Sequence, residues 1–203
     1  MTDYFALLDE PRRPWIDPGR LKAKFLALSV GAHPDKIHTA PPADRGAANQ
    51  RFVELNAAFK CLREPRERLR HLLELELGDT TREIQEIPPG LADMFTEIAQ
   101  VRREVNTFLA EASRVQSPLL RVQMFERAQE WTDQLRAIQQ RLSDGEAQLH
   151  EELQVLDADW SRLESDPVQH GTLLQRVEHI YRVLSFYTRW HTQIQETVVQ
   201  LSL

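Results

Sequence analysis

The sequence predicts an all-α fold in two parts, and two patterns carry this prediction. Apolar residues recur at alternating steps of three and four along most of the 203-residue chain, which is the spacing of one face of a helix. No stretch shows the alternation of apolar and polar residues that is typical of a strand. Apolar residues make up 41% of the chain and charged residues 28%, so we expect a packed core and exclude disordered and collagen-like classes.

A shift in charge marks the boundary between the two parts. Residues 1–77 carry a net charge of +2 and residues 78–203 a net charge of −8, which together give the −6 of the whole chain. Glycine and proline are frequent just after this shift, at 78–81 and 88–90. We therefore predict a first domain at 1–78, a linker at 79–90 and a second domain at 91–203. The acidic second part argues against nucleic acid as a partner.

The composition also limits the compartment and the chemistry. No run approaches the ~18 apolar residues of a membrane span, and the N-terminal residues lack the order of a signal peptide, so we expect a cytoplasmic protein with no membrane partner. The single cysteine, Cys61, and the seven histidines lack the spacing of a metal site. No nucleophile elbow, P-loop or GxGxxG pattern is present. We expect neither an enzyme nor a bound cofactor.

Short helices are predicted throughout residues 1–78. The apolar cluster at residues 4–8 is long enough for two turns, Asp17-Pro18 begins a second helix that ends near Gly31, and Pro65 begins the last one. The second and third helices each carry one apolar face, formed by Leu21, Phe25 and Leu28 and by Phe52, Leu55, Phe59 and Leu62. These faces predict an antiparallel pair of helices on either side of a proline-containing loop.

That loop contains His33-Pro34-Asp35-Lys36, a sequence that is common by itself but significant in this position. The cluster DYFALL, a helix, the His-Pro-Asp tripeptide and the helix RFVELNAAFKCLREP follow one another in the order that resembles the J domain of DnaJ-type co-chaperones. Within that family, DYFALL at 3–8, LNAAF at 55–59 and REPRERLRHLLELELG at 63–78 are similar to HscB, an iron–sulfur co-chaperone. The resemblance covers residues 3–78.

This resemblance implies a mechanism without chemistry in the chain itself. A J domain docks on a DnaK-type ATPase, and its tripeptide triggers ATP hydrolysis so that the chaperone clamps a client. Asp35 would pair with an arginine of the chaperone, and basic residues would steer docking. The implied chaperone-binding residues are His33, Pro34, Asp35, Lys36, Arg20, Lys22 and Lys24. The chain departs from the family at residues 29–32, Ser-Val-Gly-Ala, where an aromatic residue and basic residues are usual.

Three long helices are predicted after residue 90. An apolar seam runs from Leu91 to Val115, and the pairs Ser117-Pro118 and Asp166-Pro167 begin two further helices. The seam of the middle segment, 118–164, stays in phase through Gly145, so we expect one helix there, in which Gly145→Ala stabilises. Short connections predict an elongated antiparallel three-helix coiled-coil bundle. Its middle helix is the longest, so part of it must overhang or fold back, and either outcome leaves apolar positions that need a partner.

The resemblance to HscB also implies a client. HscB-like proteins use the acidic, apolar face of the bundle to bind IscU, the scaffold on which iron–sulfur clusters are assembled, and the corresponding segment here is LADMFTEIAQVRREV at 91–105. Glu97 and Glu104 match that pattern in kind, whereas Thr96, Ala99 and Arg103 depart from it. The implied client-binding residues are Leu91, Phe95, Glu97, Ile98 and Arg102. The alternative is a helix surface whose composition serves helix stability alone.

Two functions therefore remain open at the level of the sequence. One is a co-chaperone that stimulates a DnaK-type ATPase and presents a client, such as an iron–sulfur scaffold protein. The other is a coiled-coil interaction or scaffolding protein whose J-like head no longer activates a chaperone. The sequence names neither the ATPase nor the client, nor does it say whether the bundle associates with itself.

Overall fold

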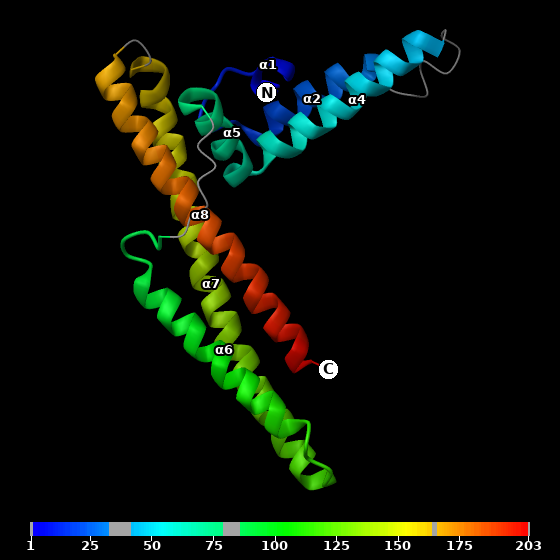
Figure 1. The fold of residues 1–203 in the computed structure, drawn as a ribbon, viewed down its shortest axis with the longest axis vertical. Coiled ribbons are helices and arrows are strands. Elements are labelled where there is room, and N and C mark those ends of the chain that lie inside the picture. The colour runs from blue at the N-terminus through cyan, green and yellow to red at the C-terminus, as the bar shows by residue number, and fades with distance from the viewer. Residues whose placement is uncertain (1, 33–41, 79–85, 164–165, 203) are drawn as a thin grey trace. The chain divides into compact units, whose positions relative to one another are not determined.

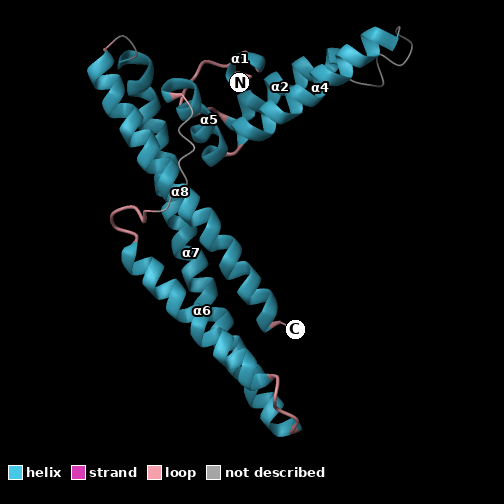
Figure 2. Ribbon diagram, viewed as in Figure 1, coloured by secondary structure: helices cyan, strands magenta, loops and turns pink. Residues whose placement is uncertain are grey.

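A computed structural model describes residues 2–32, 42–78, 86–163 and 166–202 of the chain. Over these residues it consists of α-helices and contains no strand, which confirms the predicted all-α class (Figures 1 and 2). The helices are α1 (Tyr4–Leu7), α2 (Pro18–Ala32), α4 (Pro42–Arg63), α5 (Pro65–Leu77), α6 (Ala92–Ala112), α7 (Pro118–Leu163) and α8 (Pro167–Leu201). None of the helices in the described part is long and apolar enough to cross a membrane.

Two of the predicted helix starts, at Asp17 and Asp166, have side-chain caps, whereas Glu64 before α5 makes no side-chain cap bond. The Asp17 carboxylate accepts a hydrogen bond from the Arg20 N–H at 2.6 Å, and Pro18 occupies the first position of α2. At the start of α8, Asp166 Oδ1 accepts from the backbone N–H groups of Val168 and Gln169 at 3.1 and 3.2 Å. These acceptors satisfy N–H groups that have no partner inside the first turn of a helix.

Contacts divide the chain into two compact units, each described separately below. The first contains Met1–Arg82 and His150–Tyr181, and the second contains Glu83–Leu149 and Arg182–Leu203. Each unit therefore takes one stretch of α7 and one stretch of α8. The boundaries expected from the sequence, 1–78 and 91–203, stay a prediction.

In the first unit, α2 and α4 form an antiparallel helical hairpin (Figure 1). The rings of Phe25 and Phe59 stack between the two helices with their centroids 4.4 Å apart. The core around this hairpin is apolar and comes from α1, α2, α4 and α5. It includes Phe5, Leu8, Leu21, Leu55, Ala58, Leu62, Leu69 and Leu72. The apolar spacing in the sequence thus predicts most of the interior face of these helices. The assignment of Leu28 to that face is wrong, because Leu28 is exposed and Ser29 is buried instead.

Two polar side chains of α5 are buried in this unit and form hydrogen bonds with backbone groups of other segments. Arg68 donates from Nε to the Pro14 carbonyl at 2.9 Å and from Nη1 to the Leu62 carbonyl at 2.8 Å, and burial lowers its pKa to about 10. His71 accepts a hydrogen bond at Nε2 from the Tyr4 N–H at 3.0 Å. Burial lowers the pKa of His71, which favours the neutral imidazole that this bond requires.

The stretch of α7 from His150 onward belongs to the first unit, where it contacts the segment between α1 and α2. The Trp160 indole donates to the Arg12 carbonyl at 3.0 Å, and Arg13 forms an ion pair with Asp157, its Nε lying 2.7 Å from Oδ1. Leu153 and Trp160 are buried. The part of the middle helix that extends beyond α6 was expected to leave apolar positions that need a partner, and the first unit supplies that partner for Leu153 and Trp160, whereas Val155 stays exposed.

In the second unit, α6 runs antiparallel to α7, and α8 completes a three-helix arrangement (Figure 1). Its core draws on all three helices and on the residue that precedes α6. The buried members are Leu91, Ile98, Leu135, Ile138, Leu142, Val183, Phe186, Tyr187, Trp190 and Ile194. These positions confirm that α6 packs along one face as its heptad spacing predicts.

Helix α7 continues through Gly145 without interruption, as the phase of its seam predicts. The glycine is required by packing, since a Cβ atom there would lie 2.8 Å from both Cε2 and Oη of Tyr187. Tyr187 is part of the buried core and has little room to move. This contact opposes the expectation that Gly145→Ala stabilises, although the residue is helical.

We predict that Gly145→Ala lowers the free energy of unfolding by about 1 kcal/mol. A gain in helix propensity of about 1 kcal/mol is outweighed by an overpacking cost of about 1–3 kcal/mol at the Tyr187 ring. In a Tyr187→Leu background the same change should stabilise instead, because the obstructing ring is absent. Urea denaturation of the four proteins measures this coupling. Equal effects in both backgrounds would contradict the proposed role of Tyr187.

Candidate functional site

The predicted trigger, His33, Pro34, Asp35 and Lys36, lies outside the described residues. In the chain it directly follows α2, which ends at Ala32, and precedes α4, which begins at Pro42. The tripeptide thus belongs to the connection between the two helices of the antiparallel hairpin.

Two of the three predicted basic residues on α2 contact an acid of the same unit. Glu10 has a side chain with no exposed area, and its Oε2 lies 2.9 Å from Arg20 Nη2 while its Oε1 lies 3.3 Å from Lys24 Nζ. Asp9 adopts a φ of 54° after α1, and the Glu10 N–H then donates to the Phe5 carbonyl at 2.9 Å. This turn directs the Glu10 carboxylate to α2. Arg20 and Lys24 therefore neutralise a buried charge.

Lys22 differs from these two residues. It is exposed, and it has no ion-pair partner within the described ranges. From the sequence, Arg20, Lys22 and Lys24 form one basic face, and nothing there indicates the contact with Glu10. An acid beside a proline resembles an ordinary residue of a surface turn, and only the fold brings it against α2.

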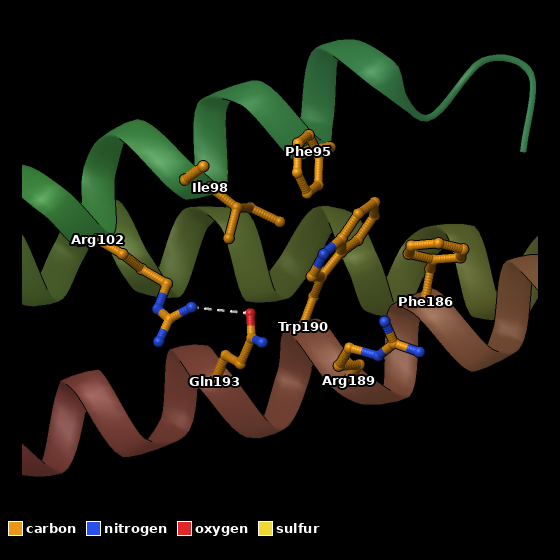
Figure 3. A pocket seen from close by; sticks show the side chains of 8 residues that line it. Phe95, Ile98, Arg102, Phe186, Arg189, Trp190 and Gln193 are labelled. Carbon is orange, nitrogen blue, oxygen red and sulfur yellow. Dashed lines mark hydrogen bonds between the residues drawn. The ribbon is translucent and has the colours of Figure 1, made fainter. Parts of the chain in front are cut away.

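The predicted client-binding residues are distributed over different environments of the second unit. Leu91 is buried in the core, and the Glu97 carboxylate is 2.5 Å from Arg141 Nη2 of α7. Phe95, Ile98 and Arg102 do come together, because all three line a pocket between α6 and α8 (Figure 3).

The pocket has a volume of about 190 Å³ and is walled by two helices. From α6 it takes Phe95, Ile98, Ala99 and Arg102, and from α8 it takes Phe186, Arg189, Trp190 and Gln193. Trp190 is 3% exposed, whereas Phe95 is 44% exposed. Arg102 Nη1 donates to Gln193 Oε1 at 3.0 Å, and this bond links the two walls (Figure 3). The wall from α8 was missed by the sequence analysis, although its members recur at steps of three and four.

Other reactive groups give no second site in the part of the chain that the structure describes. No three His, Cys, Asp or Glu side chains gather there as metal ligands would. Cys61 is buried, and burial raises the pKa of its thiol to about 11, so the thiol is protonated at neutral pH.

Comparison with known proteins gives consistent relatives. The chain is 30% identical over 115 residues to a co-chaperone HscB homologue of Chromobacterium violaceum, a match that covers 57% of this chain and 65% of that protein. It is 37% identical over 73 residues to a homologue of the same name from Azoarcus sp., covering 36% of this chain and 41% of that protein. The chain is similar to the HscB co-chaperones.

The fold of this HscB-like chain agrees with the sequence comparison. The crystal structure of human co-chaperone protein HscB superposes with a TM-score of 0.55 at 20% identity, covering 96% of this chain and 81% of the human one. At that identity the likeness concerns the fold. The chain matches less than two thirds of the length of the two curated relatives. No family model matches it.

The division of roles on α2 predicts different effects of alanine substitution. Arg20→Ala leaves the buried Glu10 with one cation, so the free energy of unfolding should fall by about 1–2 kcal/mol, less than for a fully buried pair because Arg20 is half exposed. Lys22→Ala should change it by less than about 0.5 kcal/mol. Urea denaturation at pH 7 measures both. A cost for Lys22→Ala equal to that for Arg20→Ala would contradict the assignment.

Proposed function

We propose that this chain is a co-chaperone that stimulates ATP hydrolysis by a DnaK-type chaperone and presents a client protein on its helical bundle. The observation that carries the proposal is the His33-Pro34-Asp35 tripeptide in the connection of an antiparallel helical hairpin, in a chain similar to the HscB co-chaperones. Neither ATP binding nor catalysis by the chain itself is required, since the partner supplies both.

The hairpin suits this role because its two helices are firmly joined. The stacked rings of Phe25 and Phe59 and the buried Leu21 and Leu55 fix α2 against α4, so a force or contact at the connection acts on a rigid pair. In the proposed complex, Asp35 accepts a charge-assisted hydrogen bond from an arginine of the chaperone.

Electrostatic steering then depends on few side chains. Arg20 and Lys24 are engaged with Glu10, so Lys22 and Lys36 are the basic residues that we assign to docking. Exposed charges of this kind affect the association rate and its salt dependence more than the lifetime of a complex. This assignment narrows the basic face that the sequence analysis predicted.

We predict that the chain, added to a matching DnaK-type chaperone, raises the rate of ATP hydrolysis. His33→Gln and Asp35→Asn should each remove most of this stimulation, and Lys22→Ala should weaken it mainly at low salt. Steady-state phosphate release measures the rate, and circular dichroism confirms that each variant is folded.

Stimulation by the Asp35→Asn variant equal to that of the original chain would contradict the proposal. It would favour the alternative, a scaffolding protein whose J-like head supports structure only. Arg20→Ala is the matched control for the loss of a positive charge. It removes a cation from the same helix, but one that we assign to stability and not to docking.

We place the client on the α6 side of the second unit, with an IscU-like scaffold protein as the candidate client. Phe95, Ile98 and Arg102 surround the pocket, and Phe95 presents the most accessible apolar ring among them. Leu91 would contribute by supporting α6 from the core, and Glu97 by its ion pair with Arg141. Interfaces of this type place one apolar anchor in a pocket and surround it with polar groups.

We predict that Phe95→Ala weakens binding of an IscU-type scaffold protein by about tenfold or more, the loss expected when an interface anchor is removed. Stimulation of the ATPase without client should stay unchanged. Phe125→Ala is the matched control, since Phe125 is an exposed phenylalanine on α7 of the same unit. Isothermal titration calorimetry measures the affinities. Equal losses for the two variants would exclude the pocket as the client site, while failure of the original chain to bind would exclude this client.

A further inference from the structure

The pocket between α6 and α8 carries positive charge in a part of the chain that is acidic overall. Two of its lining residues, Arg102 and Arg189, are arginines, and none is Asp or Glu. Two acids of α6 near the pocket in sequence have other partners: Glu97 contacts Arg141, and Glu104 accepts from Gln100 at 2.9 Å. Asp93 is exposed and does not line the pocket. The two arginines therefore face the pocket without a compensating carboxylate in its lining.

Arg102 retains a donor that nothing satisfies. Its Nη1 donates to Gln193, but its Nε is buried and has no hydrogen-bond partner within the described residues. Because this Nε is shielded, the guanidinium meets a ligand in the pocket through its terminal Nη groups. The bond to Gln193 also fixes the guanidinium at the side of the pocket (Figure 3).

Arg189 is held differently but faces the same pocket. Its guanidinium lies over the ring of Phe186, with Cζ 5.2 Å from the ring centroid, and the residue is exposed. Stacking on an aromatic face leaves the N–H groups at the edge of the guanidinium free to bind a carboxylate in the plane. No ion pair is described for Arg189 in the ranges that the structure covers.

The remaining lining is apolar and sets the size of the occupant. Ile98, Phe186 and Trp190 are buried walls, and the partly exposed ring of Phe95 borders the opening (Figure 3). A volume of about 190 Å³ is below the roughly 300–1,000 Å³ of small-molecule and cofactor clefts. It suits one large side chain of a protein, as in the anchor pockets of interfaces.

We propose that this pocket holds an apolar side chain of a client segment whose neighbouring residues are Asp or Glu. The apolar side chain enters between Phe95 and Trp190, and the flanking carboxylates accept hydrogen bonds from Arg102 and Arg189. This inference rests on the proposed client-presenting function and specifies the chemistry of the client at that site. Charge complementarity is the feature that selects an acidic segment over a neutral or basic one.

The test uses the full chain and two fluorescein-labelled hexapeptides. Both have Phe-Leu at their centre, one with two glutamates on each side and the other with two lysines on each side. Fluorescence anisotropy should show the acidic peptide binding at least about tenfold more tightly at low salt, with the difference shrinking as salt is added. Replacing the central Phe-Leu by Ala-Ala should abolish binding of the acidic peptide.

Two variants test the arginines. Arg189→Glu should reverse the preference between the peptides, and Arg102→Gln should reduce binding of the acidic peptide about fivefold or more, as the loss of a charge-assisted hydrogen bond predicts. Arg103→Glu is the matched control, because Arg103 is exposed on α6 and does not line the pocket. It should leave the preference in place.

Three results would overturn the inference: equal binding of the two peptides, binding of neither, or a reversal produced by Arg103→Glu as readily as by Arg189→Glu. A fourth result would also overturn the inference: if the chain associates with itself and Arg189→Glu abolishes this association, the occupant of the pocket is a second copy of the chain. The ATPase assay without client is independent of the pocket. If the chain does not stimulate the ATPase but still prefers the acidic peptide, the proposed co-chaperone role is rejected. If the chain stimulates the ATPase but shows no preference between the peptides, only the acidic client is rejected.

Discussion

The antiparallel packing of α7 against α8 is the constraint on which both compact units depend, because each unit includes a stretch of both helices. Side-chain contacts mark this pairing along its length. In the first unit, Trp160 and His170 have ring centroids 4.7 Å apart. In the second unit, Gly145 lies against the ring of Tyr187, and Gln139 donates to Gln195 at 3.1 Å. Within each unit residue numbers fall along α7 as they rise along α8, so each stretch of the pair has its own antiparallel register. A shift in that register within either unit would disturb the apolar core of that unit.

The regular spacing of apolar residues and the capping residues along single helices explain most of what the sequence predicts correctly. The capping acids Asp17 and Asp166 and the prolines after them mark helix starts, and an unbroken seam carries α7 through Gly145. These signals are local, since a cap needs only the next few residues and a seam needs only regular spacing. Fold class and helix limits therefore follow from the sequence with few errors.

The candidate site is less accessible to the same reasoning because it depends on pairing between helices. Nothing in the spacing of Arg20 and Lys24 shows that Glu10 lies between them, and only packing shows that Tyr187 fills the space beside Gly145. The pocket wall from α8 was missed for the same reason. Phe95 and Arg102 could be selected from α6 alone, whereas Trp190 becomes relevant only once α8 is known to lie beside it.

The ion pair between Arg13 and Asp157 has a consequence for biosynthesis. Its partners are 144 residues apart in the chain, and the bond from Trp160 to the Arg12 carbonyl spans 148. At a synthesis rate of roughly 5–20 residues per second, about 7–30 s pass between the appearance of the two sides on a ribosome. The segment between α1 and α2 is therefore synthesised well before the part of α7 that it contacts. During that interval α1, α2, α4 and α5 are stabilised only by their own core and by the hydrogen bond from Arg68 to the Pro14 carbonyl.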